Sequence, residues 1–453
     1  DIGFTQISVS HVVSPLMKFV SRGDTTVVDA YLTPILKRYV DRVAGELDGV
    51  RLMFMQSNGG LTDARLFQGK DSILSGPAGG VIGAVRTSEQ AGFDKIISFD
   101  MGGTSTDVSH YAGTFERAFD TKVAGVRMQV PIMRIHTVAA GGGSILHFDG
   151  MRLRVGPDSA GANPGPACYR RSGPLALTDC NVMLGKLDQR FFPSQFGPNA
   201  DEPLDVDIVG IEFKRFAQEI NAATGSGQSA EAIAEGFLRI AVENMANAIK
   251  EISVQRGYDV TGYTLNCFGG AGGQHACHVA DALGMTRIFL HPFAGVLSAY
   301  GMGLADIRAL RERAVEAELD APLIPRLEAA LGEMESEAQA ELTTQGLNAE
   351  QVSIQHKVHV RYGGSDTAII VAFGNARAIR ARFEEKHHAQ YGFTLPDKIL
   401  MVEAVAIEAV GATEEVLEKV SIVDGDATLL RSPEPMLVKP VFTGGRFHDT
   451  PFF

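Results

Sequence analysis

The segment 96–109, IISFDMGGTSTDVS, restricts the folds open to this chain more than any other part of the sequence. Ile96–Phe99 is apolar and β-prone, as a buried strand is. Asp100 ends this strand, and glycines, hydroxyls and a second acid follow it: Gly102, Gly103, Thr104, Ser105, Thr106 and Asp107. Glycines after a strand let the backbone approach a ligand closely and turn its N–H groups toward an anion.

This order of strand, acid, glycines and hydroxyls suits a metal-bound polyphosphate. The hydroxyls at 104–106 add donors, and a carboxylate at a strand end is well placed to hold a divalent cation through water. A purely structural interpretation is also open, in which the segment is a β-hairpin with an Asx-type turn and capping hydroxyls. The segment is not a Walker loop, because no Lys follows the glycines.

Three further glycine-rich segments occur at 76–80, 141–144 and 269–273. The first opens an apparent helix, where unpaired N–H groups favour an anion, although close helix–helix packing through small residues explains it equally well. The other two follow β-prone residues, and the spacing at 269–273 does not fit the dinucleotide fingerprint. A Rossmann-like turn or close packing is the alternative there. Together with 100–107, these segments suit a nucleotide held between two α/β lobes.

Single histidines and cysteines give weaker signals. His136 is a candidate metal ligand or proton-transfer group, although a lone His is more often a hydrogen-bonded structural residue. Cys168 lies in a Gly- and Pro-rich loop, but nothing in the sequence indicates a lowered thiol pKa. His387 and His388 are adjacent on a predicted helix and point to different sides, which argues against a joint metal site.

Charge and cysteine content narrow the function classes. The net charge of −13 argues against a nucleic-acid or anionic-membrane partner, since both require a basic surface. Four cysteines in 453 residues, none spaced as C-x-x-C, signal no zinc site and suggest a reduced, intracellular protein. The sequence shows no secretory signal and no apolar run long enough to cross a bilayer, so we expect a cytoplasmic protein. Both ends look cut, which suggests part of a longer polypeptide.

Hydrophobic periodicity predicts an α/β protein. Apolar residues recur at helical spacing from Thr25 to Leu47, and we expect a helix whose apolar stripe lies in the core. The segment 193–229 is predicted to be a variable connection, and 230–256 a long amphipathic helix. The charged segment 307–349 is predicted to be a solvated helical stretch.

Several long motifs resemble the A-type half of the hydantoinase/oxoprolinase family and, within it, the ATP-dependent 5-oxoprolinases. The resemblance spans nearly the whole chain. The motifs are LSGPAGGV (74–81), FDMGGTSTDVS (99–109), HTVAAGGGS (136–144), VGPDSAGANPGPACYR (155–170) and CFGGAGGQHA (267–276).

The resemblance implies an actin/hexokinase-like ATPase fold, with two lobes around a nucleotide cleft and a β-rich C-terminal region. It divides the chain into an ATPase core at 1–306 and a C-terminal α+β domain at 307–453. The family's first phosphate loop does not appear here, so the first lobe is expected to be truncated. The family's B-type half, fused or separate, is also missing.

The resemblance implies hydrolysis of 5-oxo-L-proline to L-glutamate, with ATP cleaved to ADP and phosphate after phosphorylation of the lactam oxygen. Such a reaction belongs to glutathione metabolism and the γ-glutamyl cycle. The implied cofactors are ATP and Mg²⁺, with K⁺ as a candidate monovalent ion. The implied partners are 5-oxoproline, the B-type half and further copies of the chain.

The resemblance also implies roles for individual residues. Asp100 would hold Mg²⁺ or its waters, Asp107 would orient the nucleophile or the metal, and His136 is a third catalytic candidate. Arg170 and His275 are weak candidates for the substrate side. The implied phosphate-binding residues are Gly102, Gly103, Thr104, Ser105 and Thr106, and the implied adenosine-side residues are Gly269, Gly270, Gly272 and Gly273.

Other functions stay open at this point. Hydantoin hydrolysis and ATP-dependent ketone carboxylation are activities of the same family. A non-catalytic nucleotide-binding module is a different class, since actin-like folds also serve chaperones and filaments. A scaffold with a degenerate site is disfavoured by the acids and hydroxyls at 100–107, although the missing first loop favours it.

Overall fold

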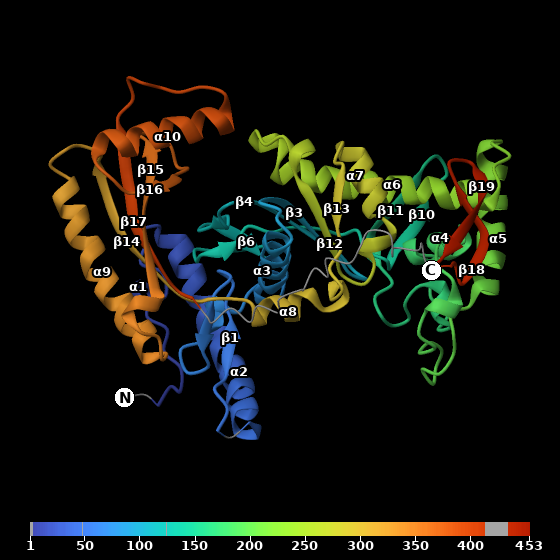
Figure 1. Ribbon diagram of the computed structural model, residues 1–453, viewed down its shortest axis with the longest axis horizontal. Helices are drawn as coiled ribbons and strands as arrows, with labels where there is room; N and C mark the ends of the chain where they lie inside the picture. Colours follow the sequence, from blue (N-terminus) through green and yellow to red (C-terminus); the bar gives the residue numbers. More distant parts are fainter. Residues whose placement is uncertain (1–2, 48, 124, 413–433) are drawn as a thin grey trace, which may run out of the picture.

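Two β-sheets with helices packed on them make up the computed structural model (Figure 1). The structure describes residues 3–47, 49–123, 125–412 and 434–453. Strands and helices are interspersed along the chain, and both sheets contain parallel as well as antiparallel pairs. The predicted α/β class is therefore confirmed.

The five-stranded sheet at the centre of Figure 1 carries the segment 96–109. Its strand order is β13-β12-β3-β4-β9; β12 is parallel to both of its neighbours, and β4 is antiparallel to both of its own. The segment is thus a β-hairpin formed by β3 and β4. The strands are β3 (Lys95–Met101), β4 (Thr106–Ala112), β9 (His136–Val138), β12 (Thr264–Phe268) and β13 (Arg287–Phe289).

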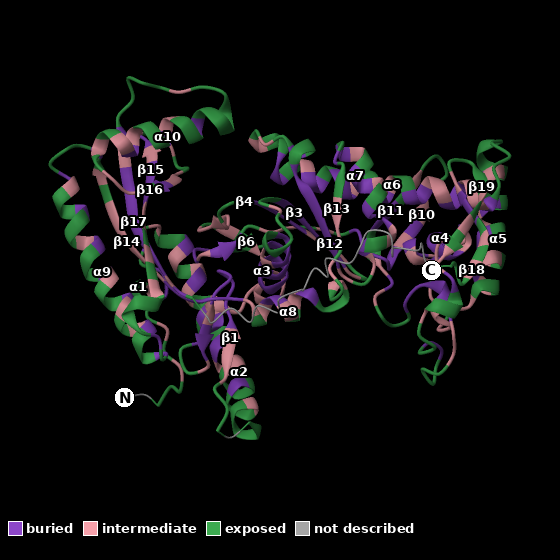
Figure 2. Cartoon of the chain, viewed as in Figure 1, coloured by how far each residue is buried: buried purple, intermediate pink, exposed green. Residues whose placement is uncertain are grey.

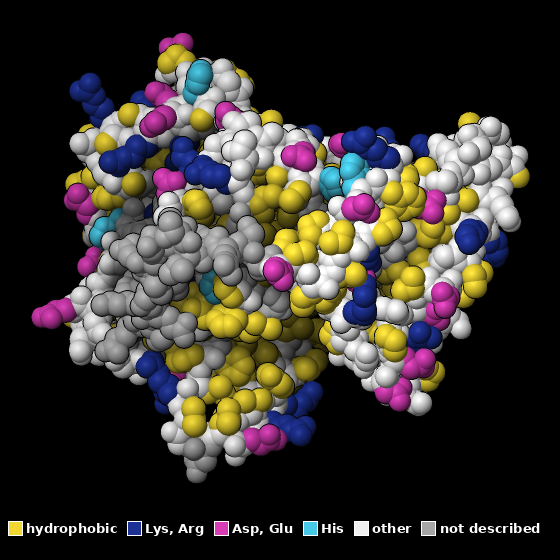
Figure 3. Space-filling view, turned by 45° about the vertical axis from the view of Figure 1, so that its right-hand side comes forward, with side chains coloured by type: hydrophobic (Ala, Val, Ile, Leu, Met, Phe, Trp, Pro, Cys, Tyr) yellow, Lys and Arg dark blue, Asp and Glu magenta, His cyan; other side chains and the backbone are white. Residues whose placement is uncertain are grey.

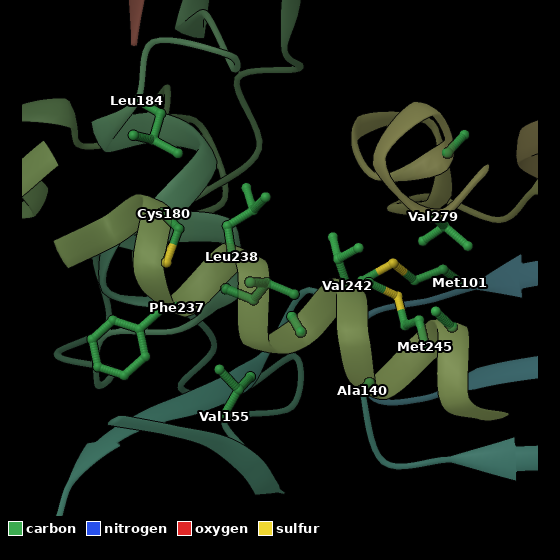
Figure 4. Packing of buried hydrophobic residues seen from close by; sticks show 14 of the residues in the cluster. Met101, Ala140, Val155, Cys180, Leu184, Phe237, Leu238, Val242, Met245 and Val279 are labelled. Carbon is green, nitrogen blue, oxygen red and sulfur yellow. The ribbon is translucent and has the colours of Figure 1, made fainter. Parts of the chain in front are cut away.

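Helix α6 (Ala230–Ile252) packs across β4 and β9, as its predicted amphipathic pattern requires. Its buried side chains include Val242 and Met245, which Figure 4 shows beside Met101 of β3. Figure 2 shows the central strands β3 and β12 largely buried. The helices around this core are α3 (Ser75–Gln90), α4 (Leu177–Met183), α5 (Val206–Thr224), α7 (Ala276–Leu283) and α8 (Leu297–Gly303).

The six-stranded sheet lies at the left of Figure 1 and has the order β1-β2-β14-β17-β15-β16. Helix α9 covers one of its faces with a buried row that includes Leu327, Leu331 and Leu342. The elements are β1 (Met53–Met55), β2 (Leu61–Asp63), β14 (Ile307–Glu318), α9 (Ile324–Thr344), β15 (Val352–Tyr362), β16 (Ile369–Ala372), α10 (Ala376–Tyr391) and β17 (Leu400–Gly411).

The prediction of a helix in 307–349 is confirmed for α9 and wrong for the strand before it, and the prediction of a connection at 193–229 is wrong. The stretch 307–349 begins with a strand, β14, because its charged residues find partners within the sheet, as Arg308 does with Glu408. The rest is α9, which is not solvated all round, since its inner row is buried. The stretch 193–229 contains α5, capped at its start by the Asp205 carboxylate and packed on α6, so it is more than a connection.

The predicted N-terminal helix exists, but its orientation differs from the prediction. Helix α2 (Phe19–Glu46) begins earlier than Thr25, after a short helix α1 (Ser10–Val13). Its inward face is mostly polar, because Asp29 accepts hydrogen bonds from Ser8 and from the backbone N–H of Lys70. Much of the apolar stripe is therefore exposed, and Figure 3 shows hydrophobic side chains over the lower projection that α2 forms.

Small hairpins complete the described chain. The hairpin of β18 and β19 packs beside α4, where Phe442 donates its N–H to the carbonyl of Leu184 at 2.9 Å, across the molecule from the six-stranded sheet (Figure 1). The division at 306/307 stays a prediction. The remaining strands are β5 (Arg117–Ala118), β6 (Thr121–Val123), β7 (Val126–Met128), β8 (Ile132–Met133), β10 (Ser144–Phe148), β11 (Leu153–Ser159), β18 (Leu437–Thr443) and β19 (Arg446–Phe452).

Short 3-10 helices join several of these elements, at Gly69–Asp71, Ala167–Tyr169, Gln189–Phe191, Val254–Arg256, Val260–Gly262, Gly272–Gln274, Ala294–Val296 and Ala349–Gln351. Within the described ranges, none of the helices combines the length and the apolar character needed to span a bilayer.

Candidate functional site

The β3–β4 hairpin places two carboxylates opposite each other. Asp100 near the end of β3 pairs in register with Asp107 near the start of β4. The loop between them is closed by a hydrogen bond from the Gly102 N–H to the Ser105 carbonyl at 3.0 Å. The hairpin is one of the two interpretations that the sequence left open, and both acids are predicted site residues, but only the register brings the acids face to face.

Burial dominates the electrostatics of the two carboxylates. Burial raises the pKa of Asp100 to about 6, with a further contribution from the charge of Asp107 and opposed by a 3.4 Å hydrogen bond from the Ser298 hydroxyl. Burial also raises the pKa of Asp107, which accepts a 2.6 Å hydrogen bond from Thr137. No Lys or Arg in the described ranges forms an ion pair with either acid. The pair is therefore suited to a positive ligand group.

The glycines at 141–143 lie against the hairpin loop through their backbones. Gly142 donates its N–H to the carbonyl of Gly102 at 3.1 Å, and Gly143 donates to Gly103 at 2.6 Å. A Cβ at Gly141 would lie 2.6 Å from the carbonyl carbon of Thr104. Glycine is required here because two backbones meet with no room for side chains.

The segment 269–273 closes on the same hairpin from the parallel strand β12. Phe268 is the register partner of Asp100, and Ala271 donates its N–H to the Met101 carbonyl at 2.9 Å. Gly269 has φ +82°, and a Cβ there would lie 2.4 Å from Asp100 Oδ1. The left-handed backbone conformation of Gly269 and its close approach to Asp100 explain why this position is a glycine.

These three glycine segments surround one pocket of about 240 Å³. Its walls combine glycine backbone with hydroxyl, amide, apolar and aromatic side chains. The lining residues are Gly103, Gly142, Gly143, Gly161, Pro166, Tyr169, Thr178, Leu187, Phe192, Gly270, Ala271 and Gln274. Such a site offers N–H groups to an anion and an apolar surface to a larger group.

The fourth glycine segment, 76–80, lets helix α3 pack closely on helix α8. A Cβ at Gly79 of α3 would lie 2.7 Å from the Ser298 carbonyl of α8, and one at Gly301 of α8 would lie 2.1 Å from the Gly79 carbonyl. The two helices thus touch through their backbones. Of the two interpretations open from the sequence, close helix–helix contact is the one that the structure supports.

Some of the residues that were predicted to bind phosphate or adenosine are exposed to a ligand, and others are buried. Gly103, Thr104, Gly270 and Gly273 are exposed. Thr106 is buried and its hydroxyl donates to the Ala140 carbonyl. A Cβ at Gly272 would lie 2.8 Å from Cys267 Sγ, so this glycine fits the interior.

Three predicted side chains lie away from the acid pair. His136 neighbours Thr137 on β9 and therefore faces the opposite side of the sheet, where its Nε2 lies 3.5 Å from Glu251. Arg170 is bound to the Pro203 carbonyl at 2.7 Å. His275 is fully buried behind the glycine loop, and burial, followed by the nearby Lys186 and His278, lowers its pKa to about 3.

Other residues of the site carry little sequence signal. Ser298, Thr137 and Thr178 are isolated hydroxyls in the sequence, and tertiary contacts bring them to the acids or the pocket. Tyr169 follows Cys168 in the Gly- and Pro-rich loop, and the composition of that loop was the sequence signal that could have indicated Tyr169. Cys168 itself is fully buried, and burial raises its thiol pKa, so it is not poised as a nucleophile.

Comparison with known proteins adds independent evidence. The sequence model of the hydantoinase/oxoprolinase family matches residues 22–311. The chain is 39% identical to 5-oxoprolinase 1 of Arabidopsis thaliana over 100% of its length and 37% of that protein. It is 41% identical to 5-oxoprolinase of Saccharomyces cerevisiae, over 91% of this chain and 33% of that protein.

A solved structure agrees with this result. The ATP-dependent caprolactamase of Pseudomonas jessenii superposes with a TM-score of 0.86 at 27% identity, over 98% of this chain and 65% of that one. The chain spans about a third of the length of the two 5-oxoprolinases that it matches. The family match and the similarity across the whole chain show that this chain belongs to the hydantoinase/oxoprolinase family.

Proposed function

We propose that the full-length protein hydrolyses 5-oxo-L-proline to L-glutamate, coupled to cleavage of ATP to ADP and phosphate. This chain would supply the nucleotide pocket. The observation that carries the proposal is the pair Asp100 and Asp107, without a Lys or Arg partner in the described ranges, on the hairpin whose loop residue Gly103 lines a pocket walled by three glycine segments. We also propose that the chain has an actin-like arrangement of two lobes and that its domains comprise residues 1–306 and 307–453.

The pocket offers different chemistry along its walls. The exposed loop at Gly103 and Thr104 presents backbone N–H groups and a hydroxyl, which suit phosphate oxygens. Leu187 and Phe192 provide an apolar surface, which suits a nucleobase. Gly270 also lines the pocket and has no side chain to obstruct a ligand.

The acid pair fits Mg²⁺ bound to a nucleotide. No group of three or more His, Cys, Asp or Glu in the described ranges could hold a metal by itself. Mg²⁺ commonly takes one or two carboxylates and completes its shell with phosphate oxygens and water. Asp100 and Asp107 accept hydrogen bonds from hydroxyls but form no ion pair with Lys or Arg in the described ranges, and both would serve this purpose. When bound, the ion would neutralise charge that develops on the phosphates.

The names of the relatives support the substrate class. Two are called 5-oxoprolinase, and the solved neighbour is called an ATP-dependent caprolactamase, so both names refer to cyclic amides. A lactam is a poor electrophile, and phosphorylation of its oxygen creates a leaving group and an attackable ring carbon. Positioning and electrostatic stabilisation are what a protein contributes to such a transfer. Hydrolysis of a larger lactam is the second candidate, which the caprolactamase similarity favours.

The decisive experiment measures phosphate and glutamate together. The full-length protein is incubated with ATP and Mg²⁺, with and without 5-oxoproline. We expect equal amounts of both products only when 5-oxoproline is present. Phosphate without glutamate would refute the substrate assignment, and caprolactam and hydantoin would then be compared. Omitting K⁺, or the B-type half if it is a separate chain, tests the proposed requirement for each.

A pair of variants connects the assay to the site. Asp100→Ala is expected to abolish both products while leaving the fold intact, because the acid faces the proposed metal. Asp201→Ala is the control, since Asp201 is exposed and forms no ion pair in the described part of the chain. Full turnover by Asp100→Ala would rule out the proposed role.

A further inference from the structure

A second and larger pocket lies near the glycine-loop pocket, since Lys186 lines the one and Leu187 the other. Its volume is about 600 Å³, and it opens between α6, α7 and the turn of the β18–β19 hairpin. Nothing in the proposed reaction uses it. The lining residues are Lys186, Glu235, Leu238, Arg239, Val242, Glu243, His278, Ala282, Thr443, Gly444 and Gly445.

Lys186 is a half-buried cation without a carboxylate partner. Its ammonium lies 2.9 Å from His278 Nε2 and forms no ion pair with an acid in the described ranges. Burial lowers the Lys186 pKa, with Glu235 and Cys277 opposing, and burial followed by Lys186 lowers the pKa of His278. Lys186 therefore donates to a neutral imidazole. A positive charge in such surroundings is stabilised when an anion arrives.

The acids that line the pocket form no ion pair with Lys186 or Arg239 in the described ranges, although the charge of Glu235 attracts Lys186. Glu235 accepts the backbone N–H groups of Gly444 and Gly445 at 2.6 and 3.1 Å, which commits this acid to the hairpin turn. Arg239 is exposed and forms no ion pair within the part of the chain that the structure describes. Glu243, one turn further along α6, is exposed and likewise unpaired there. Two cationic donors are thus available to a ligand.

Three aliphatic side chains form one wall of the pocket, opposite in character to the polar turn at 443–445 that also lines it. Leu238 and Val242 are 4% and 5% exposed and lie on α6, where Figure 4 shows them on the same stretch of helix; Ala282 of α7 adds to this surface. No Phe, Tyr or Trp is among the residues lining the pocket, and the one ring there, the imidazole of His278, is hydrogen-bonded to Lys186. Cations beside an aliphatic wall match a ligand with an anionic head and a carbon chain.

We propose that this pocket binds a small aliphatic carboxylate. Its oxygens accept hydrogen bonds from Lys186 and Arg239, and its carbon chain lies against Leu238 and Val242. The site is distinct from the glycine-loop pocket, since the two pockets share no lining residue. They are close together, because Lys186 lines this pocket and the next residue, Leu187, lines the other. The inference therefore stands or falls independently of the proposed ATP site.

Calorimetric titration of the full-length protein tests the proposal, with acetate, hexanoate and inorganic phosphate as separate probes. Hexanoate should bind more tightly than acetate, because its additional methylene groups are removed from water. Lys186→Gln should weaken hexanoate binding roughly tenfold or more, as expected for loss of a charge-assisted hydrogen bond. Arg239→Gln should also weaken it.

Lys214→Gln is the matched control, because Lys214 is an exposed lysine on the neighbouring helix α5 and does not line the pocket. It should bind hexanoate as the wild type does, and each variant is checked for an unchanged circular dichroism spectrum. Unchanged affinity in Lys186→Gln would overturn the proposal. So would absence of hexanoate binding, or phosphate binding more tightly than hexanoate.

Discussion

Replacement of Asp100 by Asn should make the protein more stable in the absence of nucleotide. Asp100 lies in the sheet opposite Asp107 with no cationic partner in the described ranges, and its pKa is raised from 3.8 to about 6. A shift of this size corresponds to about 3 kcal/mol between the charged and neutral forms. Asn removes the charge with little change in shape, so this penalty should disappear.

The pH dependence has a definite sign. Below pH 3.8 the carboxyl group of Asp100 is protonated in both the folded and the unfolded protein, and the variant gains nothing. Between pH 3.8 and about 6 the unfolded chain loses the proton while the folded protein keeps it, so wild-type stability falls as pH rises. The advantage of Asp100→Asn should grow through this window and then stay constant.

The assay is thermal or urea unfolding of the full-length wild type and variant from pH 4 to pH 8, in EDTA and without nucleotide. Asp201→Asn is the control, because Asp201 is exposed and has no ion pair in the described ranges, and it should show no advantage at any pH. An Asp100→Asn variant that is less stable than wild type at pH 7, or whose advantage shrinks between pH 4 and pH 6, would refute the reasoning.

Three further perturbations probe other parts of the fold. Gly301→Ala should cost about 1–3 kcal/mol of unfolding free energy, because its Cβ would lie 2.1 Å from a backbone oxygen of α3, whereas Gly303→Ala, with nothing within 4 Å, should be tolerated in the same denaturation assay. Glu408→Ala should cost about 3–5 kcal/mol, because two buried arginines lose their shared partner; a loss below 1 kcal/mol by urea unfolding would contradict this. Burial, opposed by Lys70, raises the pKa of Glu312 to about 8, so the stability of Glu312→Gln relative to wild type should increase from pH 4.5 to pH 8, and a pH-independent difference would argue against a buried neutral acid.

Local sequence was sufficient for much of the site. The apolar run before Asp100 and the glycines after it predicted a strand and a turn, and the structure has both. The helix at 230–256 was also predicted, because its apolar residues follow the helical period. Such features depend on neighbours in the chain, so short-range patterns report them.

Two of the wrong predictions share one physical cause. The charged residues of 307–318 resemble a solvated helix until Arg308 meets Glu408 across the sheet. The apolar stripe of α2 resembles a core face, but polar contacts of Asp29 with distant residues turn the other side inward. In both cases, partners far away in the sequence decide which surface is buried.

The sequence by itself determined the family, the α/β class and the presence of glycine-rich turns after strands. Only the tertiary structure decided which turns meet: 102–103, 141–143 and 269–271 share one pocket, while 79–83 packs two helices together. It also placed His136, Arg170 and His275 away from the acid pair. The physical reason is that a glycine's role depends on what approaches its missing side chain, and that neighbour comes from another part of the chain.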